Sequence, residues 1–396
     1  MSIAHEATPR RRTVAPPTIR EHRIPTAGSK PYIAVEGRDG CLWFCESGAS
    51  KIGRLDPRTY AFTEFDLPTP NATPIGIVEG PDGAFWFAEK TGNKIGRITT
   101  GGTITEFPLP TPNAGPDAMM AGPDGNIWFS QTEVSQIGRI TPDGAITSFK
   151  DGITPGSKPL SIVVRDGVMW FSEAAGDHIG RLTVNGEITE FPLPTPNAGP
   201  DAMMAGPDGN IWFSQTEVSQ IGRITPAGTI TSFKDGITPG SKPLSIVVRA
   251  GVMWFSEAAG DHIGRLTVDG EITEFPIPSK GSQPRAMCPH PDGSIWFVQT
   301  SANGLCRIDR DGGMIEYKVT TPNASLRSVC VGPDGDLWFT ENFANKIGRM
   351  APDGTMLGEY DIPTPDSDAR CIAAMSDGRF FFTQCSAGLI GEVIVK

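Results

Sequence analysis

An aromatic pair that recurs about every 42 residues constrains the fold of this chain more than any other feature. Each repeat also contains four short apolar stretches and turns of the Pro-Asp-Gly type, and no stretch shows the 3.6-residue period of a helix. Four strands in such a period are typical of a β-propeller blade, which buries its faces only by stacking on its neighbours. The pairs are Trp43-Phe44, Trp86-Phe87, Trp128-Phe129, Trp170-Phe171, Trp212-Phe213, Trp254-Phe255, Trp296-Phe297, Trp338-Phe339 and Phe381-Phe382.

Nine pairs predict an all-β, nine-bladed β-propeller with four antiparallel strands per blade. The last unit supplies only three strands, whereas residues 18–25 have the fourth-strand pattern seen in residues 104–110. We therefore expect the N-terminal segment to complete the last blade and close the ring, because an open ring would leave unpaired strand edges. We expect residues 18–396 to form one propeller domain, preceded by a flexible arm of residues 1–17.

A second repeat lies inside the first. Residues 104–187 recur as residues 188–271 with four differences, Asp143/Ala227, Ala145/Thr229, Asp166/Ala250 and Asn185/Asp269. These 84 residues correspond to two blades, and the other blades differ from one another at most positions. We infer that a two-blade unit was copied, by nature or by design, into a ring that would otherwise have seven blades.

Composition excludes some classes of function. The net charge of −11 argues against nucleic-acid binding, and no apolar run approaches the length of a membrane helix. Seven cysteines at irregular spacings indicate free thiols of a reducing compartment rather than a disulfide framework. We therefore expect a cytoplasmic monomer that binds neither nucleic acid nor membrane.

The repeat motif resembles the virginiamycin B lyase (streptogramin B lyase) family over residues 18–396. The clearest instance joins Trp86-Phe87-Ala88-Glu89 to Asn93-Lys94-Ile95-Gly96-Arg97-Ile98, and Pro-Thr-Pro-Asn-Ala segments follow several blades. The resemblance implies a propeller that carries Mg²⁺ at one end of its channel. It also implies a metal-dependent C–O lyase that opens a cyclic depsipeptide by elimination, with histidines placed directly after a proline on the innermost strands of the last blades.

The equivalent channel positions in this chain contain no histidine. Because arginine is always protonated, the arginines at three of these positions are poor general bases, and the lyase mechanism does not transfer residue by residue. The alternative is a non-catalytic propeller, natural or engineered, that binds a small molecule, a peptide or a protein at its channel. The nine positions are Tyr32, Ile75, Asp117, Leu160, Asp201, Leu244, Arg285, Arg327 and Arg370.

Five charged residues of this set form the candidate binding site. Arg285, Arg327 and Arg370 fall on three consecutive blades, and Asp117 and Asp201 lie on two others. One interpretation is an arc of arginines that faces a pair of acids and binds carboxylate or phosphate groups. The other interpretation is a solvated rim whose charges compensate each other.

Metal sites are less clearly indicated. Glu341 and Asp368 are the candidate ligands for a magnesium ion of the kind that the resemblance implies. A Glu or Gln two residues after each aromatic pair could bind a cation with a neighbour or hydrogen-bond loop backbone. His178, with Asp177 and Glu173, forms a weak metal or acid/base cluster that His262, Asp261 and Glu257 repeat, and a surface-loop role is the alternative. No motif indicates another cofactor.

Overall fold

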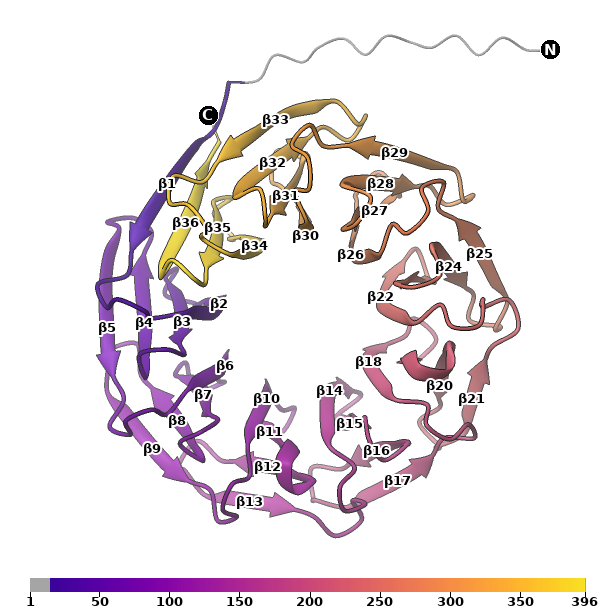
Figure 1. Ribbon diagram of the computed structural model, residues 1–396. Coiled ribbons are helices and arrows are strands. Elements are labelled where there is room, and N and C mark those ends of the chain that lie inside the picture. The colour runs from indigo at the N-terminus through magenta and orange to yellow at the C-terminus, as the bar shows by residue number, and fades with distance from the viewer. Residues whose placement is uncertain (1–14, 396) are drawn as a thin grey trace, which may run out of the picture.

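The computed structural model describes residues 15–395 except for the side chains of residues 371, 373 and 374, and it shows a closed ring of nine four-stranded antiparallel sheets (Figure 1). Blades 1 to 3 comprise β2 (Pro31–Glu36), β3 (Leu42–Glu46), β4 (Lys51–Asp56), β5 (Ala61–Asp66), β6 (Pro74–Glu79), β7 (Phe85–Glu89), β8 (Lys94–Ile98), β9 (Ile104–Pro108), β10 (Pro116–Ala121), β11 (Ile127–Gln131), β12 (Gln136–Ile140) and β13 (Ile146–Phe149). Blades 4 to 6 comprise β14 (Pro159–Arg165), β15 (Val168–Glu173), β16 (His178–Leu182), β17 (Ile188–Pro192), β18 (Pro200–Ala205), β19 (Ile211–Gln215), β20 (Gln220–Ile224), β21 (Ile230–Phe233), β22 (Pro243–Arg249), β23 (Val252–Glu257), β24 (His262–Leu266) and β25 (Ile272–Pro276).

Blades 7 to 9 complete the ring, and the prediction of a nine-bladed all-β propeller is confirmed. They comprise β26 (Pro284–Pro289), β27 (Ile295–Gln299), β28 (Gly304–Ile308), β29 (Met314–Lys318), β30 (Leu326–Val331), β31 (Leu337–Glu341), β32 (Lys346–Met350), β33 (Met356–Asp361), β34 (Ala369–Ala374), β35 (Phe380–Gln384), β36 (Leu389–Ile394) and β1 (Thr18–Arg23). Two 3₁₀ turns, η1 (Thr132–Val134) and η2 (Thr216–Val218), add the only helical residues in the described part of the chain. None of the described helical segments could span a bilayer.

The N-terminal strand closes the ring as expected. β1 pairs antiparallel with β36, from Thr18 opposite Ile394 to Arg23 opposite Leu389. The predicted closing segment, which begins at Thr18, is therefore the outermost strand of the last blade. Most of the expected flexible arm, residues 1–14, lies outside the described residues.

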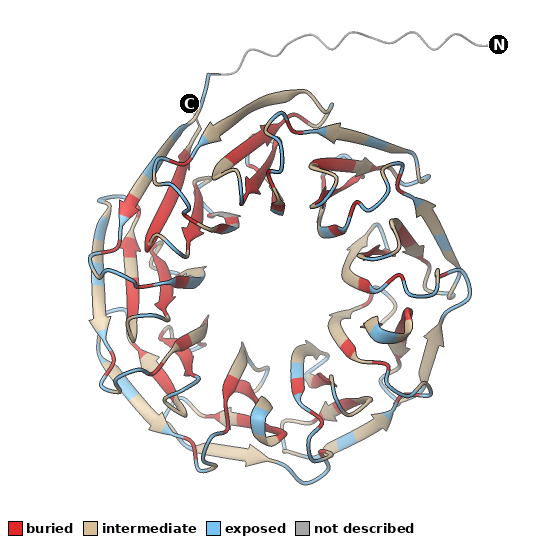
Figure 2. Cartoon of the chain, viewed as in Figure 1, coloured by how far each residue is buried: buried red, intermediate tan, exposed pale blue. Residues whose placement is uncertain are grey.

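The aromatic pairs build the contacts between blades. Nine buried clusters join neighbouring blades, and in each the Trp of one blade or its ring-closing equivalent meets apolar residues of the next. Buried residues accordingly lie within the blades all around the ring (Figure 2). Trp86 of blade 2, for example, packs with Ile127 and Phe129 of blade 3. Because each blade supplies half of two such clusters, burial of apolar surface favours the closed ring over an isolated blade.

Five of the Trp side chains also donate a hydrogen bond from Nε1 to an Asp of their own blade. Trp86 Nε1 donates to Asp82 Oδ1 at 3.2 Å, Arg97 Nε donates to Asp82 Oδ2 at 2.9 Å, and the Arg97 guanidinium lies 5.6 Å from the Trp86 ring. Cation–π contacts of the same type recur in most of the other blades. This recurrence accounts for the repeated arginine of the Ile-Gly-Arg motif as a structural residue.

The glycine of the same motif leaves room for the Phe of the pair. A Cβ on Gly96 would lie 2.1 Å from the ring of the fully buried Phe87. We therefore expect Gly96→Ala to lower the free energy of unfolding by about 1–3 kcal/mol, because the ring has no space to move away. Urea denaturation provides the measurement.

Gly101→Ala is the matched control, because its Cβ would meet no atom closer than 3.8 Å. The control should unfold at the same urea concentration as the unmodified chain. An equal loss of stability in both variants would contradict the assigned role of Gly96.

The two faces of the ring differ in their connections. The innermost strand of each blade begins at one face, which we call the mouth face, and the inter-blade linkers and the loops between the second and third strands lie on this face too. Outer-strand glutamates hold the linkers there. Thr69, in the linker before blade 2, donates from N and Oγ1 to Glu106 at 2.9 and 2.6 Å. The linkers therefore frame the channel mouth in a defined position.

Candidate binding site at the channel mouth

The nine channel positions share one backbone feature. In every blade the pairing of the innermost strand with the next strand shifts register directly after its first residue, for example between Pro116 and Met119. Such an irregularity bends the strand and re-aims its side chains. The channel positions fall within this irregularity, at the mouth end of each innermost strand.

The three arginines are exposed on neighbouring strands. Arg285 lies on β26, Arg327 on β30 and Arg370 on β34, and these strands form one continuous arc of the inner wall (Figure 1). Arg285 and Arg327 form no ion pair with any residue between 15 and 395, whereas Arg370 contacts Asp368 at 2.8 Å. Two of the three guanidinium groups therefore keep their donors free for a ligand.

Asp117 and Asp201 lie two blades apart on the inner wall, so they do not form a single acidic pair that faces the arginines. Asp117 accepts a hydrogen bond from Lys90 Nζ at 2.8 Å, so its charge is compensated by the neighbouring blade. β10, which carries Asp117, lies across the ring from β30 and β34, and β18, which carries Asp201, lies between β14 and β22 (Figure 1). Ligand binding by any of these five residues stays a prediction.

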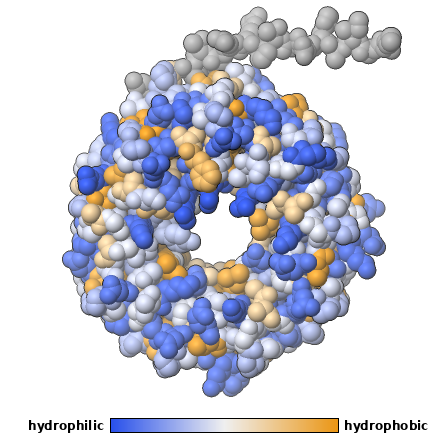
Figure 3. Space-filling view, in the orientation of Figure 1, coloured by the Kyte–Doolittle hydropathy of each residue, from blue (hydrophilic) through white to orange (hydrophobic). Residues whose placement is uncertain are grey.

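A pocket of about 270 Å³ lies at the mouth face between blades 9 and 1. Arg370, Lys30 and Tyr32 line it, and Tyr32 is 47% exposed. The space-filling view shows the open centre of the ring beside these blades (Figure 3). The pocket thus combines two cations with an accessible aromatic ring, next to Asp368, Cys385 and two serines.

The residues proposed for magnesium do not fit the ion. Glu341 is fully buried inside blade 8, whereas Asp368 accepts hydrogen bonds from Asn342 at 2.9 Å and Arg370 at 2.9 Å. Burial opposes ionisation of Asp368, but these donors lower its pKa overall. A carboxylate whose charge is already neutralised by a guanidinium is a poor ligand for a second cation. Mg²⁺ also needs several oxygens arranged octahedrally around it. Neither candidate therefore offers a free carboxylate to a magnesium ion.

The Glu and Gln residues that follow the aromatic pairs point into the blades. All nine are fully buried, and the side-chain hydrogen bonds of Gln131, Gln215 and Gln299 are made with the outermost strand rather than with loop backbone. Gln131 Nε2, for example, donates to Ser148 Oγ at 2.9 Å. A Glu at this position always faces a Glu on the outermost strand of its blade, whereas Gln faces Ser148 and Ser232 in blades 3 and 5 but Glu316 in blade 7. The nine are Glu46, Glu89, Gln131, Glu173, Gln215, Glu257, Gln299, Glu341 and Gln384.

The carboxyl groups of the five glutamates in this set have pKa values above the ordinary range. Burial, followed by the nearby charge of Glu359, raises the pKa of Glu341 to about 8. Between the ordinary carboxyl pKa of about 4.3 and this value, the native state binds more protons than the unfolded state. The free energy of unfolding must therefore fall as the pH rises through this range.

We expect Glu341→Gln to reduce this fall between pH 5 and pH 9 by about 1–3 kcal/mol, because each pKa unit corresponds to about 1.4 kcal/mol. Gln fits this position, since Gln299 occupies it in blade 7. Urea denaturation at both pH values measures the difference. Parallel pH profiles of the variant and the unmodified chain would contradict a protonated Glu341.

The structure brings the Glu and His of each predicted histidine cluster together, but the third member of each cluster differs from the prediction. Glu173 and His178 lie opposite each other in the pairing of β15 with β16. Asp177 is turned away from them, because its carboxylate accepts hydrogen bonds from the backbone N–H groups of Asn197 at 2.5 Å and Ala198 at 2.7 Å in the next linker. Glu190 on β17 takes its place, which sequence reasoning missed. Blade 6 repeats this arrangement with Glu257, His262 and Glu274.

Comparisons with known proteins agree with the repeat motif. The sequence profile of the virginiamycin B lyase family matches residues 11–251 and 237–396. The chain belongs to this family. No curated protein matches it in sequence.

Solved structures of lyases share this family fold. A virginiamycin B lyase from Staphylococcus aureus is 29% identical, with a TM-score of 0.55 over 96% of this chain and 100% of the other. A streptogramin B lyase is 27% identical, with a TM-score of 0.54 over 96% and 98% of the two chains. A catalytically inactive histidine-to-alanine variant of the S. aureus lyase, in complex with quinupristin, is 27% identical with a TM-score of 0.53, over 96% and 100% of the two chains.

Proposed function

We propose that this family member binds an anionic small molecule or peptide at its channel mouth and does not catalyse the elimination that the lyases perform. The observation that supports the proposal most is the composition of the nine channel positions. Three consecutive blades present exposed arginines there, and none presents a histidine. Arginine forks match carboxylate and phosphate groups, whereas a proton next to a carbonyl requires a general base.

The comparison with the inactive variant supports the second half of the proposal. In the S. aureus lyase, replacement of one histidine by alanine gives a catalytically inactive protein. Our chain lacks a histidine at every channel position, and its candidate magnesium ligands are turned inward or neutralised by arginine. Loss of both the base and the cation would leave the propeller able to bind but unable to eliminate.

The mouth offers a ligand both charge and apolar contact. Arg285 and Arg327 provide free guanidinium donors in a chain whose overall charge is −11. Tyr32 is 47% exposed and Phe343, in the mouth-face loop after β31, is 75% exposed. Tyr32 shares its pocket with Lys30 and Arg370, and an open aromatic ring beside cationic groups favours a ligand with an acidic group and an attached ring or apolar chain.

The binding test uses citrate, inorganic phosphate and phenyl phosphate as probes in isothermal titration calorimetry. We expect the unmodified chain to bind at least one of them. Joint replacement of Arg285, Arg327 and Arg370 by Gln should weaken this binding at least tenfold with little loss of stability, because all three residues are exposed. Phenyl phosphate should bind more tightly than phosphate.

A charge-matched control separates local contacts from net charge. Arg38, Arg58 and Arg310 lie in turns on the face opposite the mouth, and their joint replacement by Gln changes the net charge equally. This control should bind the probes as the unmodified chain does. Absence of binding by the unmodified chain, or equal weakening in both triple variants, would contradict the proposed site.

A further inference from the structure

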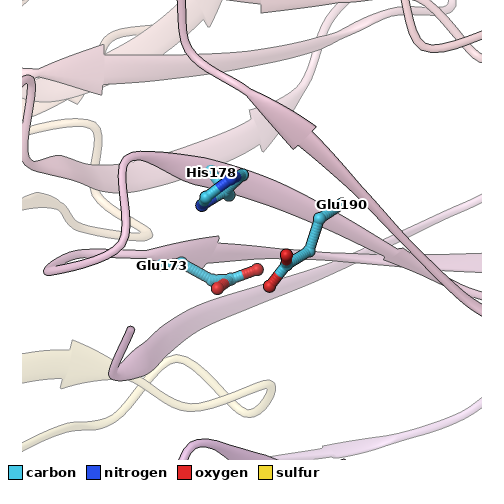
Figure 4. Close-up of side chains that lie close together, drawn as sticks. All are labelled: Glu173, His178 and Glu190. Atoms are coloured by element: carbon cyan, nitrogen blue, oxygen red, sulfur yellow. The ribbon is translucent and has the colours of Figure 1, made fainter. Parts of the chain in front are cut away.

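Two identical clusters of potential metal ligands lie in blades 4 and 6. Glu173, His178 and Glu190 form the first cluster, in which one ligand atom of each residue lies within 4.8 Å of the others (Figure 4). Glu257, His262 and Glu274 form the second with the same limit. All of these residues except Glu274 belong to the duplicated residues 104–271, and none of them is one of the nine channel positions.

Strand register brings each cluster together. Glu173 pairs with His178 across β15 and β16, and Glu190 pairs with Gly180, two residues further along β16, across β16 and β17. Because residues two apart in a strand share a face, His178 and the side chains opposite it point to the same side of the sheet. The arrangement rests on three paired strands, which hold ligands more firmly than loops do.

The cluster leaves strong acceptors without partners. Glu173 is fully buried, and neither of its carboxylate oxygens has a hydrogen-bond partner among residues 15–395. His178 Nδ1 is also buried without a partner, as are Glu257 and His262 Nδ1 in blade 6. Glu190 accepts from Thr154 Oγ1 at 2.8 Å and retains further lone pairs. A carboxyl group buried without donors must be protonated or compensated by a cation, and a bound metal ion would replace the proton. Glu46, Glu89 and Glu341 are buried without donors too, so the histidine beside the two glutamates is what distinguishes blades 4 and 6.

The equivalent positions of the other blades carry different residues. Where a lysine is present, it contacts an acid of the outermost strand rather than the buried glutamate, namely Asp66 in blade 1, Glu106 in blade 2 and Asp361 in blade 8. In blades 1, 2 and 8 a lysine takes the place of the histidine between two glutamates, as in Glu89, Lys94 and Glu106, where Lys94 Nζ contacts Glu106 at 2.5 Å. In blades 3 and 5 all three positions are neutral, as in Gln131, Gln136 and Ser148. Blades 4 and 6 alone combine the two glutamates with a histidine. An imidazole ligates metals, whereas an ammonium group does not.

We propose that each of these clusters binds one divalent transition-metal ion of the Zn²⁺ class, so that the chain binds two. One imidazole nitrogen and two carboxylates are ligands that Zn²⁺ accepts, and three protein ligands leave a position open for water. The side chain of His262 is 20% exposed and that of Glu257 is fully buried, which leaves an approach from the histidine side.

Isothermal titration of the chelator-treated full chain with Zn²⁺ tests the assignment. The single variant His178→Lys should bind one equivalent fewer than the unmodified chain, and the double variant His178→Lys/His262→Lys should bind two fewer. Lys fits the position, because Lys51, Lys94 and Lys346 occupy it in other blades. His178→Gln/His262→Gln gives a second, uncharged pair, since Gln136 and Gln220 occupy it too. Circular dichroism verifies that the variants remain folded.

The reciprocal variant tests the role of the histidine. Lys94→His places an imidazole between Glu89 and Glu106 in blade 2 and should add one equivalent of bound Zn²⁺. The proposal would be overturned if the unmodified chain binds no Zn²⁺, if both double variants keep its stoichiometry, or if Lys94→His gains no site.

Discussion

A chain that begins at Pro25 is expected to lose the single cooperative unfolding transition of the closed ring. The deletion removes β1, whose six residues pair with β36 along its full length. It also removes the fully buried Ile24 and the contact of His22 Nε2 with the buried Glu392 at 2.9 Å. A buried carboxylate that loses its hydrogen-bond partner costs about 1–3 kcal/mol or more, and a native domain is stable by only about 5–15 kcal/mol.

The measurement is a thermal melt combined with size-exclusion chromatography. A chain that begins at Ala15 is the matched control, because it removes only residues that precede β1 and should melt as the full chain does. The truncated chain should melt at a much lower temperature or aggregate through the exposed edge of β36. Equal melting of both truncated chains would show that ring closure does not depend on β1.

Deletion of residues 188–271 should produce a folded ring of seven blades. The deletion joins Glu187 to Ile272, which recreates the local sequence of the original junction because Ile188 and Ile272 begin the same strand pattern. Blade 4 then meets blade 7 with almost the same residues that blade 6 uses now, since the two copies differ at four positions in the turns opposite the mouth. The clusters that join Trp254 to Ile295 and Phe297 can therefore form again through Trp170.

Small-angle scattering and thermal melting test this prediction on the shortened chain. The expected result is a compact monomer of smaller radius with a cooperative transition. Deletion of residues 146–187 is the matched control, because it places blade 3 against blade 5, a pair of faces that are not in contact in this ring. That control should be less stable. Aggregation of the two-blade deletion would contradict the view that a pair of blades was inserted into a seven-bladed ring.

The fold could be predicted almost entirely from the sequence, because one repeat fixes both the strands and their partners. The spacing of the aromatic pairs set the blade count, and the pattern of residues 18–25 placed the closing strand. These features depend on local patterning and on the need to pair every strand edge. Burial of Trp43 and its equivalents followed from the same repeat.

The site was less predictable, because it depends on which side chains meet across strands. Glu190 lies 17 residues after Glu173, and their contact follows from the register of three strands rather than from local spacing. A signal was present, since a Glu after the aromatic pair always accompanies a Glu in the outermost strand of the same blade. Asp177 was misplaced because a residue next to His178 in sequence points the other way and caps the linker.

Ion pairs between residues of neighbouring blades could not be predicted from the sequence either. Lys90, which neutralises Asp117, lies in the loop after β7 of the preceding blade, so this ion pair forms only when the two blades stack. The partner of Arg370 is local, at Asp368, but the free state of Arg285 and Arg327 emerges only in the assembled ring.

The most direct test of the account is a streptogramin B turnover assay with and without Mg²⁺, run beside the S. aureus virginiamycin B lyase. If the family fold has been kept while its channel chemistry has changed, this chain should leave the antibiotic ring intact at every Mg²⁺ concentration at which the lyase opens it. Magnesium-dependent ring opening by the unmodified chain would contradict the account and would require a general base outside the nine channel positions.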